Sequence, residues 1–414
     1  MKNKIMRRVF TIIVFVFALC MMSACGSEKN SESVDNERKT APMQSVIADN
    51  EGLPREQIGN YKIWTESETD DETGTIKKLS LYATEEGGDK VLLEEVGEDT
   101  YFSPNPVSDG EYVYYSLSEY KLGSNSAGAV YKIALDSGEK GKLAELDSML
   151  DFAGIYNDVI YYTVHNDRTI NGVDLYSYSL KEKESELVKE NFSADDQFGS
   201  YMVGTQSRHD PNVPYYILNL ETGEFKEILS AWEVRIRENG LSFSKYTDDN
   251  MRWIVGECDY SGNIESEKEF KTDEKMLYLG RNKAYILDET GDLCKFDYGA
   301  ETVEPENFDI EQRLTGHWEN FLAHSVAETV ELDFDENGRV TCTMPRDIYY
   351  GTYEIKEGNV YMEFNEGEFF VQGAAEWEHE DDIEFRIKGK VKYNRIDLEI
   401  GDTEGWNVAV AKFL

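Results

Sequence analysis

The chain has 414 residues, of which 40% are apolar, 12% aromatic and 30% charged. This length predicts two or three domains, and a composition that can bury a large core argues against wholesale disorder. Lys and Arg number 42 and Asp and Glu number 82, which gives a net charge of -40. A charge this negative argues against nucleic-acid binding and against electrostatic docking on anionic lipid.

The first 24 residues are typical of a secretory signal peptide. Four basic side chains within residues 1–8 precede an apolar run from Val9 to Met22, which only Thr11 interrupts. The run is shorter than the about 20 residues that a membrane-spanning helix needs. A basic start, a short apolar stretch and small residues before a cleavage point indicate export from the cytoplasm.

The end of this segment carries an attachment signal. Met22-Ser23-Ala24-Cys25 resembles the bacterial lipobox, although that motif usually has Leu where Met22 stands. The resemblance implies that Cys25 is acylated, with palmitate or a similar chain, and becomes the mature N-terminus. Its acyl chains would hold the protein to the bacterial cell membrane, at ~0.8 kcal/mol per buried CH₂. An ordinary secretory peptide or an uncleaved anchor is the alternative.

Residues 25–43 predict a flexible tether. The stretch is polar, has no aromatic residue, and has Val34 as its only large apolar side chain before Pro42. Such a composition cannot form a packed core and behaves as a linker. We therefore expect an extracytoplasmic, lipid-anchored protein whose folded part begins at about residue 44.

Residues 44–310 predict a β-propeller. An aromatic-rich strand, a second strand, a Gly or Asp turn and a third strand recur every ~40–50 residues, which is the period of a propeller blade. Val113–Leu117, Ile160–Val164 and Phe243–Tyr246 are examples of the first strand. Alternation of apolar and polar residues over short runs indicates antiparallel strands. We count six such units, to within one or more.

The repeats have a family resemblance. Val159-Ile160-Tyr161-Tyr162 and Asp174-Leu175-Tyr176-Ser177-Tyr178 resemble the six-bladed modules of the low-density-lipoprotein-receptor (YWTD) type, which also occur in bacterial lipoproteins. The strict Tyr-Trp-Thr-Asp tetrad is absent, and Ile63-Trp64-Thr65-Glu66 comes nearest to it. The resemblance implies a six-bladed ring, in which we expect the tyrosines to pack between blades.

Residues 311–414 predict a small β-barrel. Gly316-His317-Trp318 resembles the Gly-x-Trp signature near the start of lipocalins, which implies a lipocalin-like barrel with Trp318 buried near its base. Eight sequential strands with short turns suggest an up-and-down barrel, filled by side chains or holding one small ligand. The short chain favours the filled form; any ligand would be small and apolar. The expected strands are 326–334, 338–344, 351–357, 359–365, 369–380, 382–390, 392–400 and 406–414, with Leu332, Phe334, Val408 and Val410 pointing inward.

The three cysteines beyond the lipobox are Cys258, Cys294 and Cys342. An odd number excludes a complete disulfide framework. Three buried or half-buried thiols are the preferred interpretation. A Cys258–Cys294 pair is the alternative, because these residues lie in neighbouring repeats.

Sequence motifs for catalysis are absent: the chain has no GxSxG, HExxH, Walker or GxGxxG pattern. We therefore predict no catalytic residue, metal or cofactor. Two acidic segments are candidates for cation sites. Asp333–Gly338 matches half of a calcium loop, but Met344 stands where an EF-hand needs Glu, so a hairpin turn is preferred. Glu376–Asp382 predicts a solvated strand face, with a weak divalent-cation site as the alternative. The five histidines are expected to be surface or packing residues: His165, His209, His317, His324 and His379.

These observations predict a membrane-anchored binding module for a protein, a glycan or a small ligand, with a protein or glycan partner expected at the propeller face. One alternative is an extracytoplasmic carbohydrate-active enzyme with its site in the propeller channel. Another is an accessory subunit of an envelope complex. A fold alone does not decide among these functions.

Overall fold

The computed structural model divides the chain into two compact units, Met1–Arg38 and Lys39–Leu414. The predicted signal peptide and Cys25 lie outside the described residues. No helix among the described residues has the length and apolarity to cross a membrane. The structure describes residues 41–46, 53–69, 76–97, 100–102, 106–119, 125–166, 168, 172–206, 212–247, 252–271, 275–299, 302–319, 330–371, 376–400 and 407–411.

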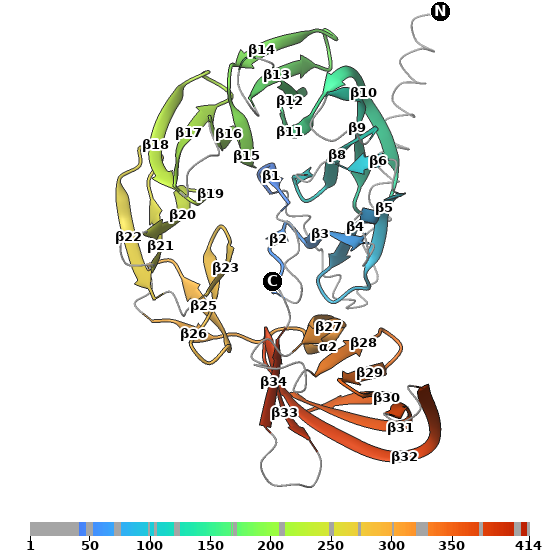
Figure 1. Cartoon of the computed structure of the whole chain (residues 1–414). Coiled ribbons are helices and arrows are strands. Elements are labelled where there is room, and N and C mark those ends of the chain that lie inside the picture. The colour runs from blue at the N-terminus through green and yellow to red at the C-terminus, as the bar shows by residue number, and fades with distance from the viewer. Residues whose placement is uncertain are drawn as a thin grey trace, which may run out of the picture. The chain divides into compact units, whose positions relative to one another are not determined.

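Four sheets of the propeller are separate blades, each an antiparallel meander of four strands (Figure 1). Short alternating segments end at tight turns, so each strand pairs with the next in sequence. The strands are β2 (Gln57–Ile58), β3 (Tyr61–Thr69), β4 (Ile76–Glu85) and β5 (Val91–Gly97); β11 (Asp151–Tyr156), β12 (Val159–His165), β13 (Val173–Ser179) and β14 (Ser185–Lys189); β19 (Glu233–Arg237), β20 (Gly240–Thr247), β21 (Arg252–Cys258) and β22 (Ile264–Phe270); and β23 (Lys275–Leu279), β24 (Lys283–Leu287), β25 (Leu293–Asp297) and β26 (Glu304–Pro305).

A fifth sheet contains ten strands: β1 (Gln44–Ser45) joins two further four-stranded meanders, and β6 pairs with β8 beside them. β1 pairs with β7 on one side and with β15 on the other, and Figure 1 shows it in the middle of the ring. The other strands of this sheet are β6 (Thr100–Phe102), β7 (Val107–Ser108), β8 (Tyr112–Glu119), β9 (Ser126–Ala134), β10 (Lys140–Met149), β15 (Ser193–Phe198), β16 (Tyr201–Thr205), β17 (Val213–Asn219) and β18 (Phe225–Ala231).

The predicted all-β, propeller-like fold is confirmed, but the predicted number of six separate blades is wrong. Four sheets stand alone, while the repeats β7–β10 and β15–β18 belong to one sheet. The sequence repeat counts the strands of each unit. It gives no signal for a two-residue strand that pairs with two units at once.

Buried tyrosines lie between neighbouring meanders, as predicted. Tyr115 shares a hydrophobic cluster with side chains of β3 and β4, Tyr162 with side chains of β7 to β10, and Tyr215 with side chains of β19 to β21. All three are at most 5% exposed. Aromatic side chains bury large areas, so they dominate the contacts that hold one blade to the next.

The C-terminal part is a curled eight-stranded sheet whose strands pair in chain order. Among the described residues its two edges meet where Glu319 is opposite Ala411. A short helix, α2 (Ile310–Leu314), leads into it and is capped by Asp309. The strands are β27 (Gly316–Glu319), β28 (Glu331–Phe334), β29 (Arg339–Met344), β30 (Asp347–Lys356), β31 (Asn359–Val371), β32 (Glu376–Val391), β33 (Arg395–Ile400) and β34 (Asn407–Ala411).

The predicted count of eight strands is right, but several boundaries are wrong, including the predicted break after residue 365, which lies inside β31. Gly316–Glu319 is itself the first strand, where the sequence predicts only an entrance to the barrel. The separately predicted strands 369–380 and 382–390 belong largely to one long strand, β32. Asp382 lies there at φ 65 inside a β-bulge, where the sequence suggests a turn. A bulge bends a strand without ending it.

Apolar side chains fill the inside of this sheet. Trp318 is fully buried, as predicted, and its indole N–H donates to the Leu314 carbonyl at 2.7 Å. Leu332, Phe334 and Val410 are buried in the same cluster, whereas the side chain of Val408 lies outside the described residues. This packed interior agrees with the filled form of the barrel.

The cysteines are buried. Cys258 and Cys342 are free thiols with no exposed area, and Cys294 is 8% exposed. The alternative Cys258–Cys294 disulfide is not formed. Burial raises the pKa of the Cys258 thiol and of the Cys342 thiol to about 12.

We expect these two thiols to resist alkylation in the folded protein at pH 8 and to react once the chain is unfolded in denaturant. The folded pKa lies above the ordinary value of 9.0. Between pH 9 and 12 the unfolded chain therefore releases thiol protons that the folded chain retains, and stability falls as pH rises through this window. Mass spectrometry after timed iodoacetamide labelling measures the protection. Rapid labelling of native Cys342 would contradict the buried core.

Candidate functional site

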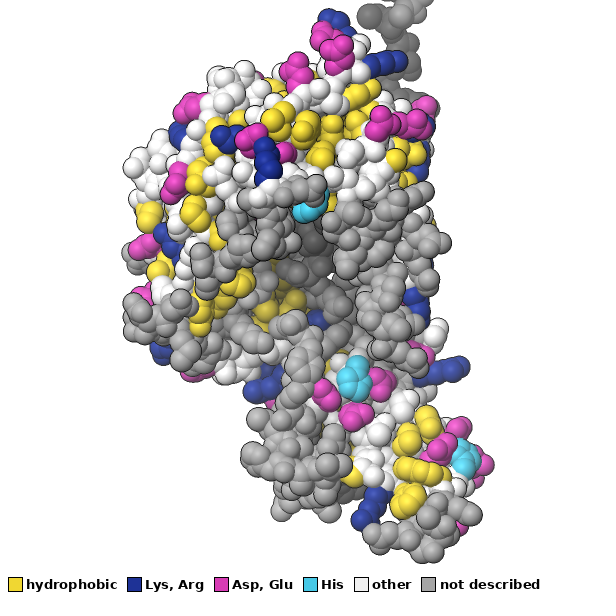
Figure 2. All heavy atoms as spheres, turned by 45° about the horizontal axis from the view of Figure 1, so that its top comes forward, with side chains coloured by type: hydrophobic (Ala, Val, Ile, Leu, Met, Phe, Trp, Pro, Cys, Tyr) yellow, Lys and Arg dark blue, Asp and Glu magenta, His cyan; other side chains and the backbone are white. Residues whose placement is uncertain are grey.

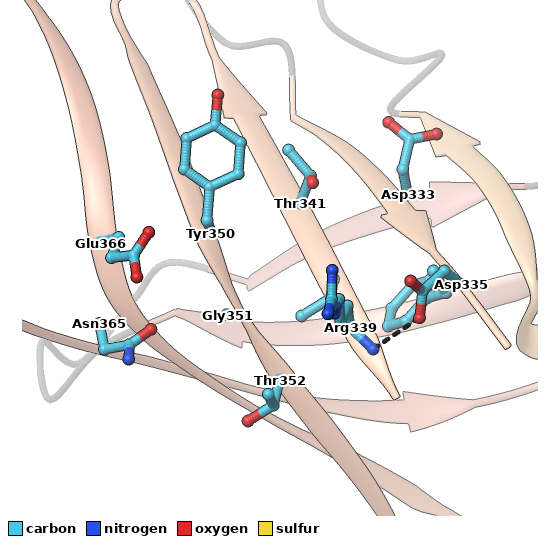
Figure 3. Close-up of a pocket in the computed structure, with 11 residues that line it drawn as sticks. Asp333, Asp335, Arg339, Thr341, Tyr350, Gly351, Thr352, Asn365 and Glu366 are labelled. Carbon is cyan, nitrogen blue, oxygen red and sulfur yellow. Dashed lines mark hydrogen bonds between the residues drawn. The ribbon is translucent and has the colours of Figure 1, made fainter. Parts of the chain in front are cut away.

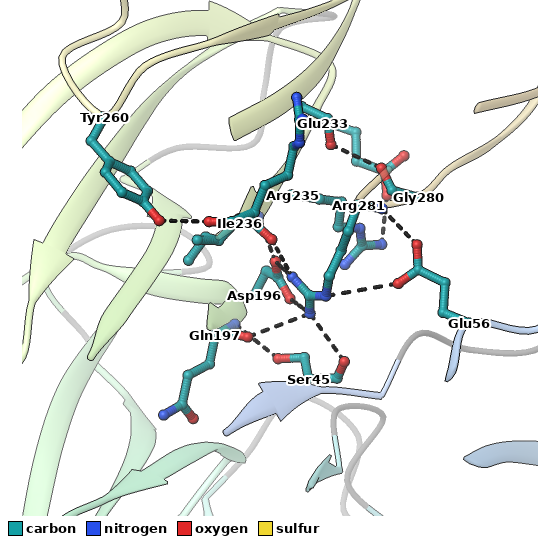
Figure 4. Close-up of polar contacts among 12 residues, drawn as sticks. Ser45, Glu56, Asp196, Gln197, Glu233, Arg235, Ile236, Tyr260, Gly280 and Arg281 are labelled. Atoms are coloured by element: carbon teal, nitrogen blue, oxygen red, sulfur yellow. Dashed lines mark hydrogen bonds and ion pairs between the residues drawn. The ribbon is translucent and has the colours of Figure 1, made fainter. Parts of the chain in front are cut away.

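A buried charged network occupies the middle of the ring (Figure 4). Arg281, in the turn between β23 and β24, is 3% exposed. Its two terminal nitrogens donate to the two carboxylate oxygens of Asp196, each at 2.7 Å. They also donate to the carbonyls of Ile236 at 2.6 Å and Ser45 at 3.1 Å. A guanidinium makes such forked contacts because its donors are planar and fixed.

The network joins five parts of the chain. The Ser45 hydroxyl of β1 accepts from the backbone N–H of Gln197 in β15 at 2.9 Å. The Glu56 carboxylate accepts from the backbone N–H of Arg281 at 2.6 Å. Burial raises the pKa of Glu56, and Arg281 opposes that shift. Beside these groups, Arg235 donates to Glu233 at 2.5 Å.

These contacts indicate that the network has a structural role. The charges of Arg281 and Asp196 are paired with each other and with backbone groups, and β1 fills space beside them. A catalytic group must be able to reach a substrate within hydrogen-bonding distance. The described residues of the network point at one another, so the geometry here supports stability over catalysis.

A pocket of about 650 Å³ lies on the C-terminal sheet, lined by side chains of β28 to β31 (Figure 3). The polar lining residues of β28 and β29 alternate with buried core positions such as Leu332 and Cys342, so they face away from the packed interior. The buried Phe334 and Val340 also line the pocket. The labelled lining residues are Asp333, Asp335, Arg339, Thr341, Tyr350, Gly351, Thr352, Asn365 and Glu366.

Strand register arranges one row of these side chains. Asp333 is opposite Thr341, Thr341 is opposite Tyr350, and Tyr350 is opposite Glu366. Figure 3 shows this row crossing the strands. Opposed residues of an antiparallel pair have Cβ atoms about 4.5–5.5 Å apart, so the row is a continuous line of hydrogen-bonding groups.

A histidine lies within hydrogen-bonding distance of an acid at each end of the row. His317 of β27 is opposite Asp333, and its Nδ1 lies 2.8 Å from the Asp333 Oδ1. Asp381 of β32 is opposite Glu366, and its Oδ1 lies 3.2 Å from the His379 Nε2. Six strands thus contribute one polar side chain each to the same face of the sheet.

The arm formed by β31 and β32 extends this face with aromatic side chains. Phe370 is opposite Trp377, with ring centroids 5.6 Å apart. Residues two apart on a strand share a face, so Trp377 lies on the same face as His379 and Asp381. Trp377 is 48% exposed. Figure 2 shows hydrophobic side chains lying beside acidic and basic ones on the face in view.

The two acidic segments have different outcomes. Asp335–Gly338 forms the hairpin turn between β28 and β29, as preferred: the Asp335 carboxylate accepts from the backbone N–H of Asn337 and of Arg339, each at 2.8 Å. These backbone bonds lower the pKa of Asp335. In the segment 376–382, one potential ligand atom each of His379, Asp381 and Glu366 lies within 4.8 Å of the others, on exposed side chains. The cation site there stays a prediction.

Of the remaining candidate residues, the structure describes only His165. His165 belongs to β12, and its backbone N–H donates to Asn125 at 2.6 Å. His209, His324 and Cys25 lie outside the described residues. No sequence motif pointed to a site at Arg281 or at the pocket residues Tyr350, Asn365 and Glu366. The alternating pattern of β28 to β31 could have placed Tyr350 and Glu366 on the outer face, but only the register shows that they are neighbours.

No known protein family matches the chain, and no curated protein matches it. Solved structures resemble it distantly. The propeller domain of the Trilobed protease from Pyrococcus furiosus has 13% identity and a TM-score of 0.31, covering 61% of this chain and 95% of that one. An uncharacterised protein from Listeria monocytogenes has 9% identity and a TM-score of 0.39, covering 75% and 92%. TolB from Acinetobacter baumannii has 12% and 0.24, covering 92% and 86%. Likenesses this loose carry no argument about function.

Proposed function

We propose that the chain is a lipid-anchored extracytoplasmic binding protein and that its ligand occupies the pocket on the outer face of β28 to β31. The observation that carries this proposal is the row from Asp333 through Thr341 and Tyr350 to Glu366, which lines one side of the pocket. Binding sites are concave and use a few convergent polar groups to fix a ligand. The propeller serves as the scaffold.

The titration of the pocket supports binding over catalysis. Burial raises the pKa of the Tyr350 hydroxyl, and the nearby Glu368 carboxylate adds to the shift. The pKa of Asp335 is lowered, as described above. Both shifts move away from neutrality, whereas a general acid or base works best with a pKa near the operating pH. At neutral pH Tyr350 is a hydrogen-bond donor and Asp335 an acceptor.

The pocket is tested by a charge reversal inside it. Glu366→Lys places a cation in the row and should reduce sedimentation of the purified, unacylated chain (residues 26–414) with isolated cell-envelope fractions, since without the acyl anchor the pocket is left to make the contact. Glu265→Lys is the matched control, because Glu265 is an exposed acid of β22 in the propeller. Equal sedimentation of the wild type and both variants would show that the pocket does not bind the envelope.

The anchor has its own test. Cys25→Ala should leave the protein unacylated and move it from the membrane to the soluble fraction, because the lipobox resemblance makes Cys25 the acyl acceptor. Fractionation of cells that express each form, with mass spectrometry of the mature N-terminal peptide, measures both effects. An unmodified mature Cys25 in the wild type would overturn this part of the proposal.

A further inference from the structure

From the outer face of β28 to β32 we infer the class of the ligand: a short oligosaccharide, neutral or bearing amino groups, with one ring stacked on Trp377 and the others hydrogen-bonded along the pocket. This inference rests on the proposed function of the pocket.

The first support is the mixture of donors and acceptors. Arg339 donates, Asp333 and Glu366 accept, and the Asn365 amide does both. The Tyr350 hydroxyl donates to the Glu368 carboxylate at 3.4 Å, and its oxygen can accept from a ligand. The hydroxyls of Thr341 and Thr352 also do both. A sugar hydroxyl donates and accepts at once, so a polyol can use every one of these groups. The cationic side chains of a basic peptide only donate, so they could pair with the acids of the pocket but not with its donors.

The second support is the aromatic surface at the arm. A sugar ring has an apolar C–H face that stacks on an indole, and Trp377 offers an exposed ring backed by Phe370 at 5.6 Å. Phe370 packs against the indole in a tilted arrangement, with the ring planes at 60°, and so restricts its movement. An indole that is half exposed on a face lined with hydrogen-bonding groups combines the two contacts that a sugar needs.

The third support is spacing. Trp377 and Asp381 are four residues apart on β32 and share a face, which places them about 13 Å apart along the strand. Asp381 is opposite Glu366, which lines the pocket. The aromatic surface and the pocket are therefore separated by a distance that one short oligosaccharide can bridge, while a single sugar cannot.

Charge selects among oligosaccharides. The pocket lining contains the acids Asp333, Asp335 and Glu366 and the single base Arg339. Glu368 and Asp381 add further acids on the same face. Anionic glycans are repelled by such a surface, and amino groups are attracted to it.

Isothermal titration of the purified mature chain tests the inference. The probes are cello-oligosaccharides and chito-oligosaccharides as neutral ligands, chitosan oligosaccharides as amino-bearing ligands, heparin fragments as anionic ligands, and oligolysine as a basic peptide. We expect binding to at least one neutral or amino-bearing set and none to heparin. Trp377→Ala should weaken that binding about tenfold, the scale of one lost stacking contact, and Trp377→Phe should restore part of it.

Trp232→Ala is the matched control, because Trp232 is 53% exposed and lies between β18 and β19 of the propeller. It should bind like the wild type. Binding to oligolysine alone, binding to heparin, or equal affinities of Trp377→Ala and Trp232→Ala would overturn the inference. These outcomes leave the proposed function standing if Glu366→Lys still reduces envelope binding, so the two failures are distinguishable.

Discussion

Arg281→Met should destabilise the propeller by about 3–5 kcal/mol, the usual cost of removing one partner from a buried ion pair. The Asp196 carboxylate is fully buried and would lose both of its guanidinium bonds. The carbonyls of Ile236 and Ser45 would lose their Arg281 donors as well. Since domains are stable by only about 5–15 kcal/mol, we expect a large fall in the midpoint of denaturant unfolding.

Two further variants test whether the unpaired buried charge causes the loss of stability. Arg386→Met removes an arginine whose side chain is 66% exposed and lies beside exposed Glu363, so it should change stability by less than about 1 kcal/mol. Arg281→Met combined with Asp196→Leu removes both charges and should recover part of the loss, because an apolar pair leaves no buried charge unpaired. Equal midpoints for Arg281→Met and Arg386→Met would contradict the role of the network.

Trp318→Ala should cost about 3–5 kcal/mol, because removing a buried aromatic side chain leaves a cavity. Trp318 has no exposed area and shares its cluster with Leu332, Phe334 and Val340. The variant also removes the indole donor of the Leu314 carbonyl. We expect the C-terminal sheet to unfold while the propeller retains its own transition, which thermal unfolding followed by circular dichroism can resolve.

Trp377→Ala is the control for this variant, since Trp377 is 48% exposed and its loss opens no cavity. Residues 310–414 expressed alone provide a direct comparison. An unfolded wild-type fragment would show that the sheet depends on the propeller. A Trp318→Ala fragment that melts at the wild-type temperature would show that Trp318 does not stabilise it.

Repeating patterns predicted most of the fold. Segments such as Ile160–Val164 carry their own strand signal, because alternation along a strand is local to the sequence. The Gly-x-Trp motif likewise placed Trp318 in the interior. The sequence pattern did not predict features that depend on pairing between strands far apart in the chain. β1 has only two residues, and the bulge at Asp382 uses acids that elsewhere in this chain form turns.

The candidate sites were hidden for a similar reason. Arg281 is one of 42 basic residues and lies in a short turn, so nothing nearby in the sequence indicates that it meets Asp196, 85 residues away. The row from Asp333 to Glu366 comes from four strands, and any one of its members is an ordinary polar residue of an outer face. Only register, which hairpin geometry and bulges set, makes them neighbours.

The position of β1 also constrains the order in which the chain can fold. Gln44 is opposite both Ser108 and Phe198, so β1 pairs with a residue 154 positions later (198 − 44). During synthesis from the N-terminus, β1 can pair with β7 early, but its second edge stays open until β15 has emerged. Closing so long a loop is entropically costly and slows folding. Until then, one edge of β1 has no partner strand. The pairing of β1 with β15 is therefore expected late in folding.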